Sequence, residues 1–484
     1  MTTIPIDLKV PTDLFIGGQW RSGESGETFP VQDPATGETI AEVANGTPDD
    51  GLAAVAAAER AFEPWAATAP RERGEVLRRA WELMTERADA LAELIVREMG
   101  KALADAKGEV AYAAEFFRWY AEEAVRNQGT IVTSPKGDKR ILVVHQPIGV
   151  SLLITPWNFP AAMATRKIGP ALAAGCPVIL KPASDTPLTA LAIAALLAEA
   201  GVPDGVVNVV PSRQSSAFST ALLADPRVRK LSFTGSTEVG RSLLELAAHQ
   251  VIDCSMELGG NAPFVVLDDA DVDAAVEGAM VAKMRNGGEA CTAANRFYVH
   301  EAVADEFTSK FTDAMQAVRM GSGLDPDTQL GPLINEGARS DVAGLVDGAL
   351  SAGAKAATGG SVPDGRGWFY PATVLDDVPP DAEILTQEIF GPVAPVVRVS
   401  SDEEAIDLAN DTEYGLVSYL YTRDLQRGLR VAEALEAGMV GLNKGLISDP
   451  AAPFGGVKQS GIGREGGAEG MHEFMESKYI ATDW

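Results

Sequence analysis

A regular alternation of apolar and helical segments over residues 150–249 constrains this chain more than any other feature. Four apolar runs have the length and composition of buried strands: V-S-L-L-I-T, P-V-I-L-K-P, V-V-N-V-V and K-L-S-F-T-G. The segments between them carry apolar residues at helical spacing. Strands that alternate with helices form a parallel, doubly wound sheet, which binds ligands at the carboxyl ends of its strands. The sequence therefore predicts an α/β fold with a site at that edge.

Polar residues follow these strands at the edge where a ligand would bind. They are Trp157 and Asn158, Lys181 to Ser184, Pro211 to Arg213, and Gly235 with Ser236. We expect them to form a dinucleotide-binding rim. The fourth junction, F-T-G-S-T-E-V-G, departs from the G-x-G-x-x-G fingerprint because Thr237 replaces the middle glycine. That junction alone is equally typical of a tight turn before a helix, and bound phosphates should not sit there in the usual Rossmann manner.

The segment 254–295 supplies a carboxylate and a thiol. Glu257 lies among apolar and glycine residues, where burial raises the pKa of a carboxyl group and suits a general base. Cys291 follows Gly287 and Gly288, which allow a close backbone approach and leave amide N–H groups free to donate to an oxyanion. A single cysteine is more often structural. The polar, glycine-rich surroundings of Cys291 favour a reactive thiol instead.

Length, charge and cysteine content exclude several classes of protein. A chain of 484 residues is expected to form two or three domains, and its net charge of −28 argues against nucleic acid or an anionic membrane as a partner. Three cysteines without C-x-x-C spacing and four scattered histidines predict neither a disulfide framework nor a metal site. Cys176 and Cys254 fit structural roles. The N-terminus lacks a signal-peptide pattern and no long apolar run occurs, so we expect a cytoplasmic protein.

A reactive thiol serves proteases, acyltransferases and oxidising enzymes, and the neighbouring motifs favour the last. No histidine lies in a glycine-rich or strand-end motif, so the available base is a glutamate. A thiolate adds to an aldehyde, hydride transfer to a nicotinamide leaves a thioester, and water activated by a carboxylate releases the acid. Asn158 can donate to the hemiacetal oxygen or act as a helix N-cap. Glu388, close to Phe390 and a Gly-Pro breaker, suits ribose hydroxyls and a planar ring, or is an ordinary loop glutamate.

Seven motifs in order resemble the NAD(P)-dependent aldehyde dehydrogenase superfamily over essentially the whole chain. They are T-P-W-N-F-P, L-K-P-A-S, F-T-G-S, M-E-L-G-G-N, G-x-x-C, E-I-F-G-P and P-F-G-G-V-K-Q-S-G-x-G-R-E. The resemblance implies Cys291 as nucleophile, Glu257 as general base and Asn158 as oxyanion donor. It implies a free carboxylic acid as product. The cofactor-binding residues that it implies are Thr155, Trp157, Lys181, Ser184, Gly235, Ser236, Leu258, Glu388 and Phe390.

The resemblance also implies a division into two domains and an arm. A doubly wound parallel-sheet cofactor-binding domain is expected from residues 1–128 and 147–255, and an α/β catalytic domain from residues 256–445. Residues 129–146 and 446–484 would form a β-strand oligomerisation arm, because a hairpin at 130–146 and a C-terminal strand both need partners. A homodimer or homotetramer is expected.

Within the superfamily, the chain resembles the succinate-semialdehyde dehydrogenases in particular. Arg166, Arg285 and the G-L-I-S run ending at Ser448 carry this resemblance, and two guanidiniums could clamp the distal carboxylate of a semialdehyde. The alternative is that both arginines lie on the surface. Asp449 places an acid at the mouth of the site and disfavours a dicarboxylate-like substrate. Other readings are a dehydrogenase for another short aliphatic or aromatic aldehyde, a non-catalytic protein of this fold, or a cysteine hydrolase.

Two further positions bear on cofactor choice and regulation. Position 184, three residues after Lys181, is serine, whereas NAD-preferring relatives often carry glutamate there. A glutamate would repel a 2′-phosphate, so Ser184 predicts that NADP is used well, with NAD as a second cofactor. Ala293 stands where some relatives have a second cysteine, so no local disulfide with Cys291 is expected.

Overall fold

The structure is a computed structural model that describes residues 8 and 10–483, so the extreme ends of the predicted 1–128 and 446–484 segments lie outside the described residues. Its first sheet has eight strands in the order β2-β1-β9-β8-β7-β10-β11-β21. The bounds are β2 Gln19–Arg21, β1 Leu14–Ile16, β9 Val207–Val209, β8 Val178–Lys181, β7 Val150–Ile154, β10 Val228–Thr234, β11 Asp253–Glu257 and β21 Gly461–Ile462. The five strands from β9 to β11 pair in parallel, which confirms the predicted doubly wound α/β sheet.

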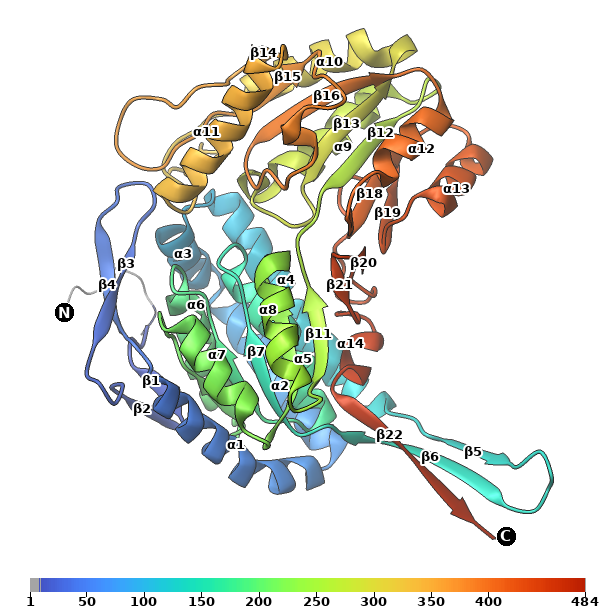
Figure 1. Cartoon of the computed structure of the whole chain (residues 1–484). Coiled ribbons are helices and arrows are strands. Elements are labelled where there is room, and N and C mark those ends of the chain that lie inside the picture. The colour runs from blue at the N-terminus through green and yellow to red at the C-terminus, as the bar shows by residue number, and fades with distance from the viewer. Residues whose placement is uncertain (1–7, 9, 484) are drawn as a thin grey trace.

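Side chains alternate between the two faces of this sheet, and each face has its own core. Leu153 of β7 packs in a cluster with α2 to α6, whereas Leu152 and Ile154 pack with α1, α7 and α8. Helices therefore cover both faces (Figure 1). Their bounds are α1 Pro48–Ala67, α2 Pro70–Glu86, α3 Ala88–Met99, α4 Leu103–Glu123, α5 Pro160–Ala174, α6 Pro187–Glu199, α7 Ser215–Ala224 and α8 Thr237–Ala248.

The second sheet has seven strands in the order β14-β15-β16-β13-β12-β18-β19. The strands are β12 Ala262–Val266, β13 Ala294–His300, β14 Lys355–Thr358, β15 Thr373–Asp376, β16 Val393–Val399, β18 Val417–Tyr421 and β19 Met439–Leu442. Phe264 packs with α9 and α10 on one face, and Val265 packs with α11 to α13 on the other. These helices are α9 Val272–Met284, α10 Glu301–Gln316, α11 Glu336–Ser351, α12 Asp402–Asn410 and α13 Leu425–Ala434.

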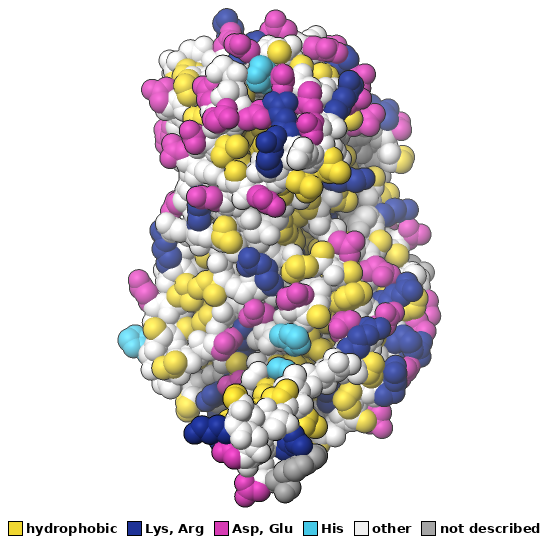
Figure 2. Space-filling model, turned by 90° about the vertical axis from the view of Figure 1, so that its right-hand side faces the viewer, with side chains coloured by type: hydrophobic (Ala, Val, Ile, Leu, Met, Phe, Trp, Pro, Cys, Tyr) yellow, Lys and Arg dark blue, Asp and Glu magenta, His cyan; other side chains and the backbone are white. Residues whose placement is uncertain are grey.

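A three-stranded antiparallel sheet projects from the body, with the C-terminus near its tip (Figure 1). Its strands are β5 Thr130–Thr133, β6 Arg140–Pro147 and β22 Met475–Thr482. β22 pairs with β6 along its whole length, so the hairpin and the C-terminal strand meet in one sheet. Its outer surface stays apolar in places, because Ile131 is 73% exposed and Tyr479 is 54% exposed. Acidic and basic side chains are interspersed over the face seen in Figure 2.

The remaining elements are short. They are the pair β3 Thr28–Gln32 and β4 Thr39–Ala44, the pair β17 Tyr414–Gly415 and β20 Val457–Lys458, helix α14 Glu469–His472, and the 3-10 turns Ala124–Arg126, Arg285–Gly288 and Glu383–Leu385. Among the described residues, no helix is both long and apolar enough to cross a membrane. Those same residues contain no group of three or more His, Cys, Asp or Glu side chains that could hold a metal ion.

One short connection carries the chain from the first sheet to the second. β11 ends at Glu257 and β12 begins at Ala262, so only four residues, Leu-Gly-Gly-Asn, separate them. The carboxyl end of a strand in the first sheet is thereby placed next to the second sheet. The functional site is built around this crossing point.

Candidate active site

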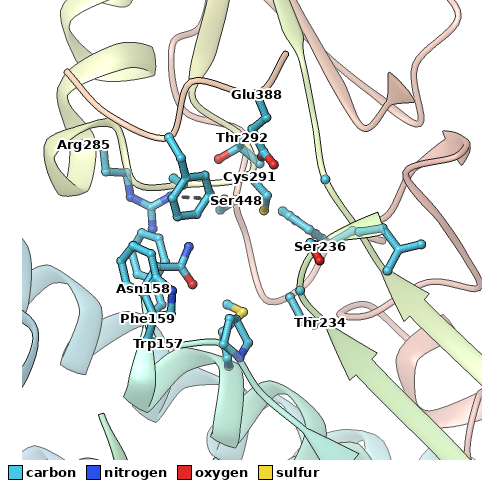
Figure 3. A pocket seen from close by; sticks show the side chains of 18 of the residues that line it. Trp157, Asn158, Phe159, Thr234, Ser236, Arg285, Cys291, Thr292, Glu388 and Ser448 are labelled. Atoms are coloured by element: carbon cyan, nitrogen blue, oxygen red, sulfur yellow. Dashed lines mark hydrogen bonds between the residues drawn. The ribbon is translucent and has the colours of Figure 1, made fainter. Parts of the chain in front are cut away.

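A cavity of about 220 Å³ lies between the two large sheets and is lined by residues from both (Figure 3). The first sheet contributes the segments that follow β7 and β10, and the second contributes the segments that lead into β13 and β16. It collects many residues predicted from the sequence: Trp157, Asn158, Gly235, Ser236, Leu258, Arg285, Cys291, Glu388, Phe390 and Ser448. Five other predicted residues are not among the described residues that line it: Thr155, Arg166, Lys181, Ser184 and Glu257.

A left-handed turn presents the thiol to the cavity. Asn286, Gly287 and Gly288 have φ angles of 57°, 63° and 79°, which is unusual for three successive residues. The Asn286 side chain stabilises the turn, because Nδ2 donates to the carbonyl oxygens of Asn158 (3.1 Å) and Glu289 (2.9 Å). A Cβ at position 288 would lie 2.2 Å from the Gly391 carbonyl oxygen. The turn therefore requires glycine there and packs tightly against the loop that carries Glu388.

The Asn158 side chain lines the same cavity as Cys291 (Figure 3). Its Nδ2 atom donates one hydrogen bond to the Glu289 carbonyl oxygen at 3.0 Å. An amide NH₂ group has two N–H bonds, so the second can donate to an oxyanion. The N-cap of α5 is Phe159, and no side chain caps that helix end. Asn158 is therefore not occupied by the helix-capping role that the sequence also allowed.

Glu257 is 2% exposed, and its Oε2 atom has no hydrogen-bond partner among the described residues. Burial raises the pKa of this carboxyl well above its usual value and the charge of Glu465 raises it further, while Arg166 and Lys167 oppose the shift. Glu257 does not line the cavity itself, but the next residue along the chain, Leu258, does. A buried, unpartnered carboxylate with a raised pKa is suited to taking a proton from a thiol or from water.

The surroundings of Cys291 favour the protonated thiol over the thiolate. Burial raises its pKa to about 12, and the charge of Arg166 only partly opposes this. Nucleophilic attack therefore requires removal of the thiol proton by a base. Glu257 is a candidate for this base, because its charge contributes to the raised pKa of Cys291. The backbone after Glu257 also packs against the Cys291 segment, since a Cβ on Gly260 would lie 2.4 Å from the Cys291 carbonyl oxygen.

The same glycine-rich segment also contacts Glu388. The Gly260 N–H donates to Glu388 Oε1 at 3.1 Å, and a Cβ on Gly259 would lie 3.1 Å from Oε2. Burial raises the pKa of Glu388 to about 7, while the Gly260 N–H and Lys283 oppose the shift. Residues 257–260 thus bring the candidate base, the nucleophile loop and Glu388 into one place. Only glycine allows the backbone to approach both neighbours this closely.

The cavity residues fit a nicotinamide dinucleotide. Gly235 and Ser236 precede α8 and line the cavity, so the positive end of a helix dipole is available for a phosphate. Glu388 offers a carboxylate for ribose hydroxyls. Phe390 lies edge-on to Trp157, with ring centroids 5.3 Å apart, and provides an aromatic surface for a planar ring.

The residues predicted to contact the adenosine end lie at the ends of β7 and β8, outside the cavity. Lys181 is 5% exposed, burial lowers its pKa to about 8, and its carbonyl oxygen accepts the Thr155 N–H. The hydroxyl of Ser184 donates to the Ser212 carbonyl oxygen. Thr237, at the altered glycine position, donates its hydroxyl to the Gln459 carbonyl oxygen.

The two predicted substrate arginines occupy different layers. Arg285 lines the cavity, donates to the Ser448 hydroxyl at 3.3 Å, and lies over the Phe159 ring at 5.0 Å from its centroid. Arg166 is 1% exposed and pairs with Glu465 at 2.5 Å. Its guanidinium stacks on Phe454, whose ring lines the cavity. Arg166 therefore lies behind the wall, in neither the surface position nor the cavity itself.

Sequence reasoning missed the partner of this buried arginine. Glu465 also accepts from Lys167 at 2.5 Å, and Lys167 donates to the Ser232 hydroxyl. The glutamate belongs to the G-R-E end of a motif quoted above, and the lysine directly follows Arg166. Two adjacent basic residues, Arg166 and Lys167, in an otherwise apolar helix could have indicated a buried acidic partner. The aromatic residues Tyr112, Phe159 and Phe454 that line the cavity were also missed, since they belong to no polar motif.

Residues 20–480 match the family model described as "Aldehyde dehydrogenase family". The chain belongs to the aldehyde dehydrogenase family. It is 60% identical over 441 residues to the succinate-semialdehyde dehydrogenase of Paenarthrobacter nicotinovorans, covering 91% of this chain and 98% of that protein. It is 50% identical to the glutarate-semialdehyde dehydrogenase of Pseudomonas putida strain KT2440, over 96% of each chain. A crystal structure of an E. coli NADP-dependent enzyme superposes with a TM-score of 0.97 at 48% identity, covering 98% of each chain.

Both the family and the α/β fold predicted from the motifs are confirmed. The prediction of an NAD(P)-dependent enzyme is confirmed as well. The roles of the individual side chains follow from the geometry and are proposed below.

Proposed function

We propose that this aldehyde dehydrogenase oxidises succinate semialdehyde to succinate with NADP, and with NAD as a second cofactor. The observation that carries the proposal is the placement of Arg285 and Ser448 in the same cavity as Cys291 and Asn158. A guanidinium bonded to a hydroxyl in an otherwise aromatic wall is a site for one carboxylate. The relatives named for carboxylated semialdehydes support the choice.

The chain's own residues provide the acid–base chemistry. Glu257 takes the thiol proton, and the sulfur of Cys291 bonds to the aldehyde carbon to give a thiohemiacetal. The second N–H of the Asn158 amide, with the backbone N–H of Cys291, donates to the oxygen that becomes negative. The bound nicotinamide supplies the acceptor for the hydride of the aldehyde carbon. A thioester on Cys291 remains.

Hydrolysis of the thioester uses the same carboxylate a second time. After Glu257 has released the thiol proton to solvent, its carboxylate removes a proton from a water molecule whose oxygen bonds to the acyl carbon. The carbon–sulfur bond then breaks, succinate leaves, and the sulfur of Cys291 is reprotonated. The raised pKa of Glu257 suits both steps, because a base with a pKa closer to neutrality accepts protons more readily than an ordinary carboxylate.

The proposed cofactor residues are the nine that the family resemblance implied. Gly235 and Ser236 at the start of α8 would hold a phosphate, and Glu388 would accept from the ribose hydroxyls beside the Phe390 ring. Lys181 and Ser184 would face the 2′ position, with Thr155, Trp157 and Leu258 completing the walls. A serine at 184 leaves no carboxylate to repel a 2′-phosphate, which supports NADP.

The test is the rate of NADP and of NAD reduction with succinate semialdehyde and with butanal, an uncharged aldehyde of equal length. We expect kcat/KM for the semialdehyde to exceed that for butanal by at least about 100-fold, as a charge-assisted pair of about 3 kcal/mol provides. Equal values for the two substrates would reject the carboxylate site and favour an uncharged aldehyde. A Cys291→Ala variant that still oxidises aldehyde would reject the mechanism.

We further propose that β5, β6 and β22 form an oligomerisation arm in a homodimer or homotetramer. Apolar side chains exposed on these strands, such as Ile131 and Tyr479, support the proposal. Residues 1–128 with 147–255 would form the cofactor-binding domain and residues 256–445 the catalytic domain. A cytoplasmic location is supported by three free cysteines, and measurement of mass in solution tests the assembly.

A further inference from the structure

A second cavity of about 200 Å³ adjoins the active-site cavity. Four residues line both: Tyr112, Phe159, Arg285 and Ser448. They form the boundary between an inner chamber, which holds Cys291, and an outer chamber, lined in addition by Ala104, Asp105, Gly108, Glu109 and Leu446. Leu446 is 50% exposed, so the outer chamber reaches the protein surface at this residue. The carboxylate site at Arg285 therefore lies where the two chambers meet.

The outer chamber contains two carboxylates that differ in their partners. Glu109 is fully compensated, because it pairs with Lys101 at 2.6 Å and accepts the Ala161 N–H at 2.8 Å. Asp105 lies in the first turn of α4 and accepts the Asn286 N–H at 3.2 Å. No salt bridge among the described residues includes Asp105: Lys101 pairs with Glu109, and Lys101 and Arg285 act on Asp105 only through their charges. Its negative charge is the one left facing the outer chamber.

We propose that Asp105 is a specificity-determining residue that excludes aldehydes whose carboxylate extends beyond Arg285 into the outer chamber. The inference rests on the proposed function and adds to it a limit on substrate length. A four-carbon semialdehyde bound to Cys291 places its carboxylate at the boundary, beside Arg285 and Ser448. Each added methylene moves the carboxylate outward, toward the like charge of Asp105. An uncharged tail of the same length meets no such repulsion.

A purely structural role for Asp105 predicts a different result. Its bond to the Asn286 N–H holds the turn that presents Cys291, so loss of this bond would slow the enzyme with every substrate alike. An asparagine at 105 keeps an oxygen that can accept the N–H while it removes the charge. The ratio of kcat/KM between substrates therefore separates the two roles.

The experiment compares wild type, Asp105→Asn and Asp449→Asn with four substrates at saturating NADP. The substrates are succinate semialdehyde, glutarate semialdehyde, butanal and pentanal. Asp449→Asn tests the competing acid, which the sequence placed at the mouth of the site; in the structure Asp449 is exposed and lines neither chamber, so its charge should not affect the choice of substrate. For Asp105→Asn we expect the glutarate-to-succinate ratio of kcat/KM to rise at least about fivefold, as loss of a like-charge contact predicts. The pentanal-to-butanal ratio should stay within about twofold, and Asp449→Asn should leave both ratios unchanged.

An unchanged glutarate-to-succinate ratio in Asp105→Asn would overturn the proposal. An equal rise in Asp449→Asn, or a parallel rise in the pentanal-to-butanal ratio, would do so too. If the asparagine variant does not fold, Asp105→Ser supplies a hydroxyl acceptor without charge, and the same ratios decide. The proposed function fails separately, when wild type shows no preference for either semialdehyde over the uncharged aldehyde of equal length.

Discussion

Replacement of Arg285 by methionine should abolish recognition of the substrate carboxylate and leave the aldehyde chemistry intact. Methionine keeps an apolar stem over the Phe159 and Tyr112 rings, on which the guanidinium now lies at 5.0 and 5.7 Å. It removes the charge and the donor to the Ser448 hydroxyl. The substrate carboxylate would then be desolvated in an aromatic chamber without a cation. Loss of one partner of such a pair costs about 2–5 kcal/mol, so kcat/KM for succinate semialdehyde should fall by at least about 30-fold.

The assay follows the nicotinamide absorbance with succinate semialdehyde and with butanal. For butanal we expect a change of less than about threefold, because butanal has no carboxylate to bind and methionine still covers the two aromatic rings. Arg166→Met is the contrasting variant. This variant leaves the buried Glu465 with Lys167 as its remaining cationic partner, which should cost about 3–5 kcal/mol of folding stability. The rates with succinate semialdehyde and with butanal should therefore fall together. An equal loss for both substrates in Arg285→Met, or a selective loss for the semialdehyde in Arg166→Met, would refute this assignment.

Three further changes test the base, the turn and the cofactor site. Glu257→Gln should lose both the first-turnover burst of NADPH and steady-state turnover, because the variant lacks the base that accepts the thiol proton and the water proton. In wild type, turnover should fall as the pH drops through the raised pKa of Glu257, since only the ionised carboxylate accepts a proton, and the residual turnover of the variant should lack this limb. Gly288→Ala should lower the melting temperature and kcat, because its φ is +79° and its Cβ would meet Gly391; the control Gly353→Ala has a φ of +112° and open space around it. Ser184→Glu should raise KM for NADP far more than KM for NAD, measured by steady-state kinetics.

Local patterns predicted the fold, and they singled out Cys291 as the candidate nucleophile, because the causes of these patterns are local. The apolar runs that became β7, β8, β9 and β10 are buried on both faces, which is why they read as continuous hydrophobic segments. Gly287 and Gly288 precede Cys291 because both positions have positive φ angles, which favour glycine. Residues at strand ends, such as Trp157 and Ser236, reached the predicted cavity because parallel strands end at one edge.

Interactions between distant residues could not be predicted in this way. Lys167 and Glu465 are 298 positions apart and meet only because the C-terminal segment folds back onto the first sheet. From the sequence, Arg166 was expected either on the surface or in contact with the substrate carboxylate. Neither alternative included the buried ion pair that it forms with Glu465 behind Phe454. The outer chamber was likewise unforeseen, because Asp105 reads as an ordinary acid in the first turn of a helix.

The pair Glu257 and Glu465 shows how one buried region keeps two carboxylates in different states. Glu465 pairs with Arg166 and Lys167, and despite its burial these cations hold its pKa below the usual value. Glu257 has no such pair, and its pKa is raised by burial and by the charge of Glu465. The pKa values of the two carboxyl groups are therefore shifted in opposite directions, which suits Glu465 to a fixed negative charge and Glu257 to accepting a proton.

Glu465→Gln should therefore move the pH dependence of turnover. The change removes a negative charge that raises the pKa of Glu257, and it leaves Arg166 and Lys167 uncompensated, which lowers that pKa further. Both effects have the same sign, so the low-pH limb of kcat should shift to lower pH. The weaker base should also hydrolyse the thioester more slowly above the limb. A pH profile of kcat measures both, with Glu473→Gln, an acid that pairs with Lys230, as the control. A limb that stays in place in Glu465→Gln would show that the charge of Glu465 does not set the proton affinity of Glu257.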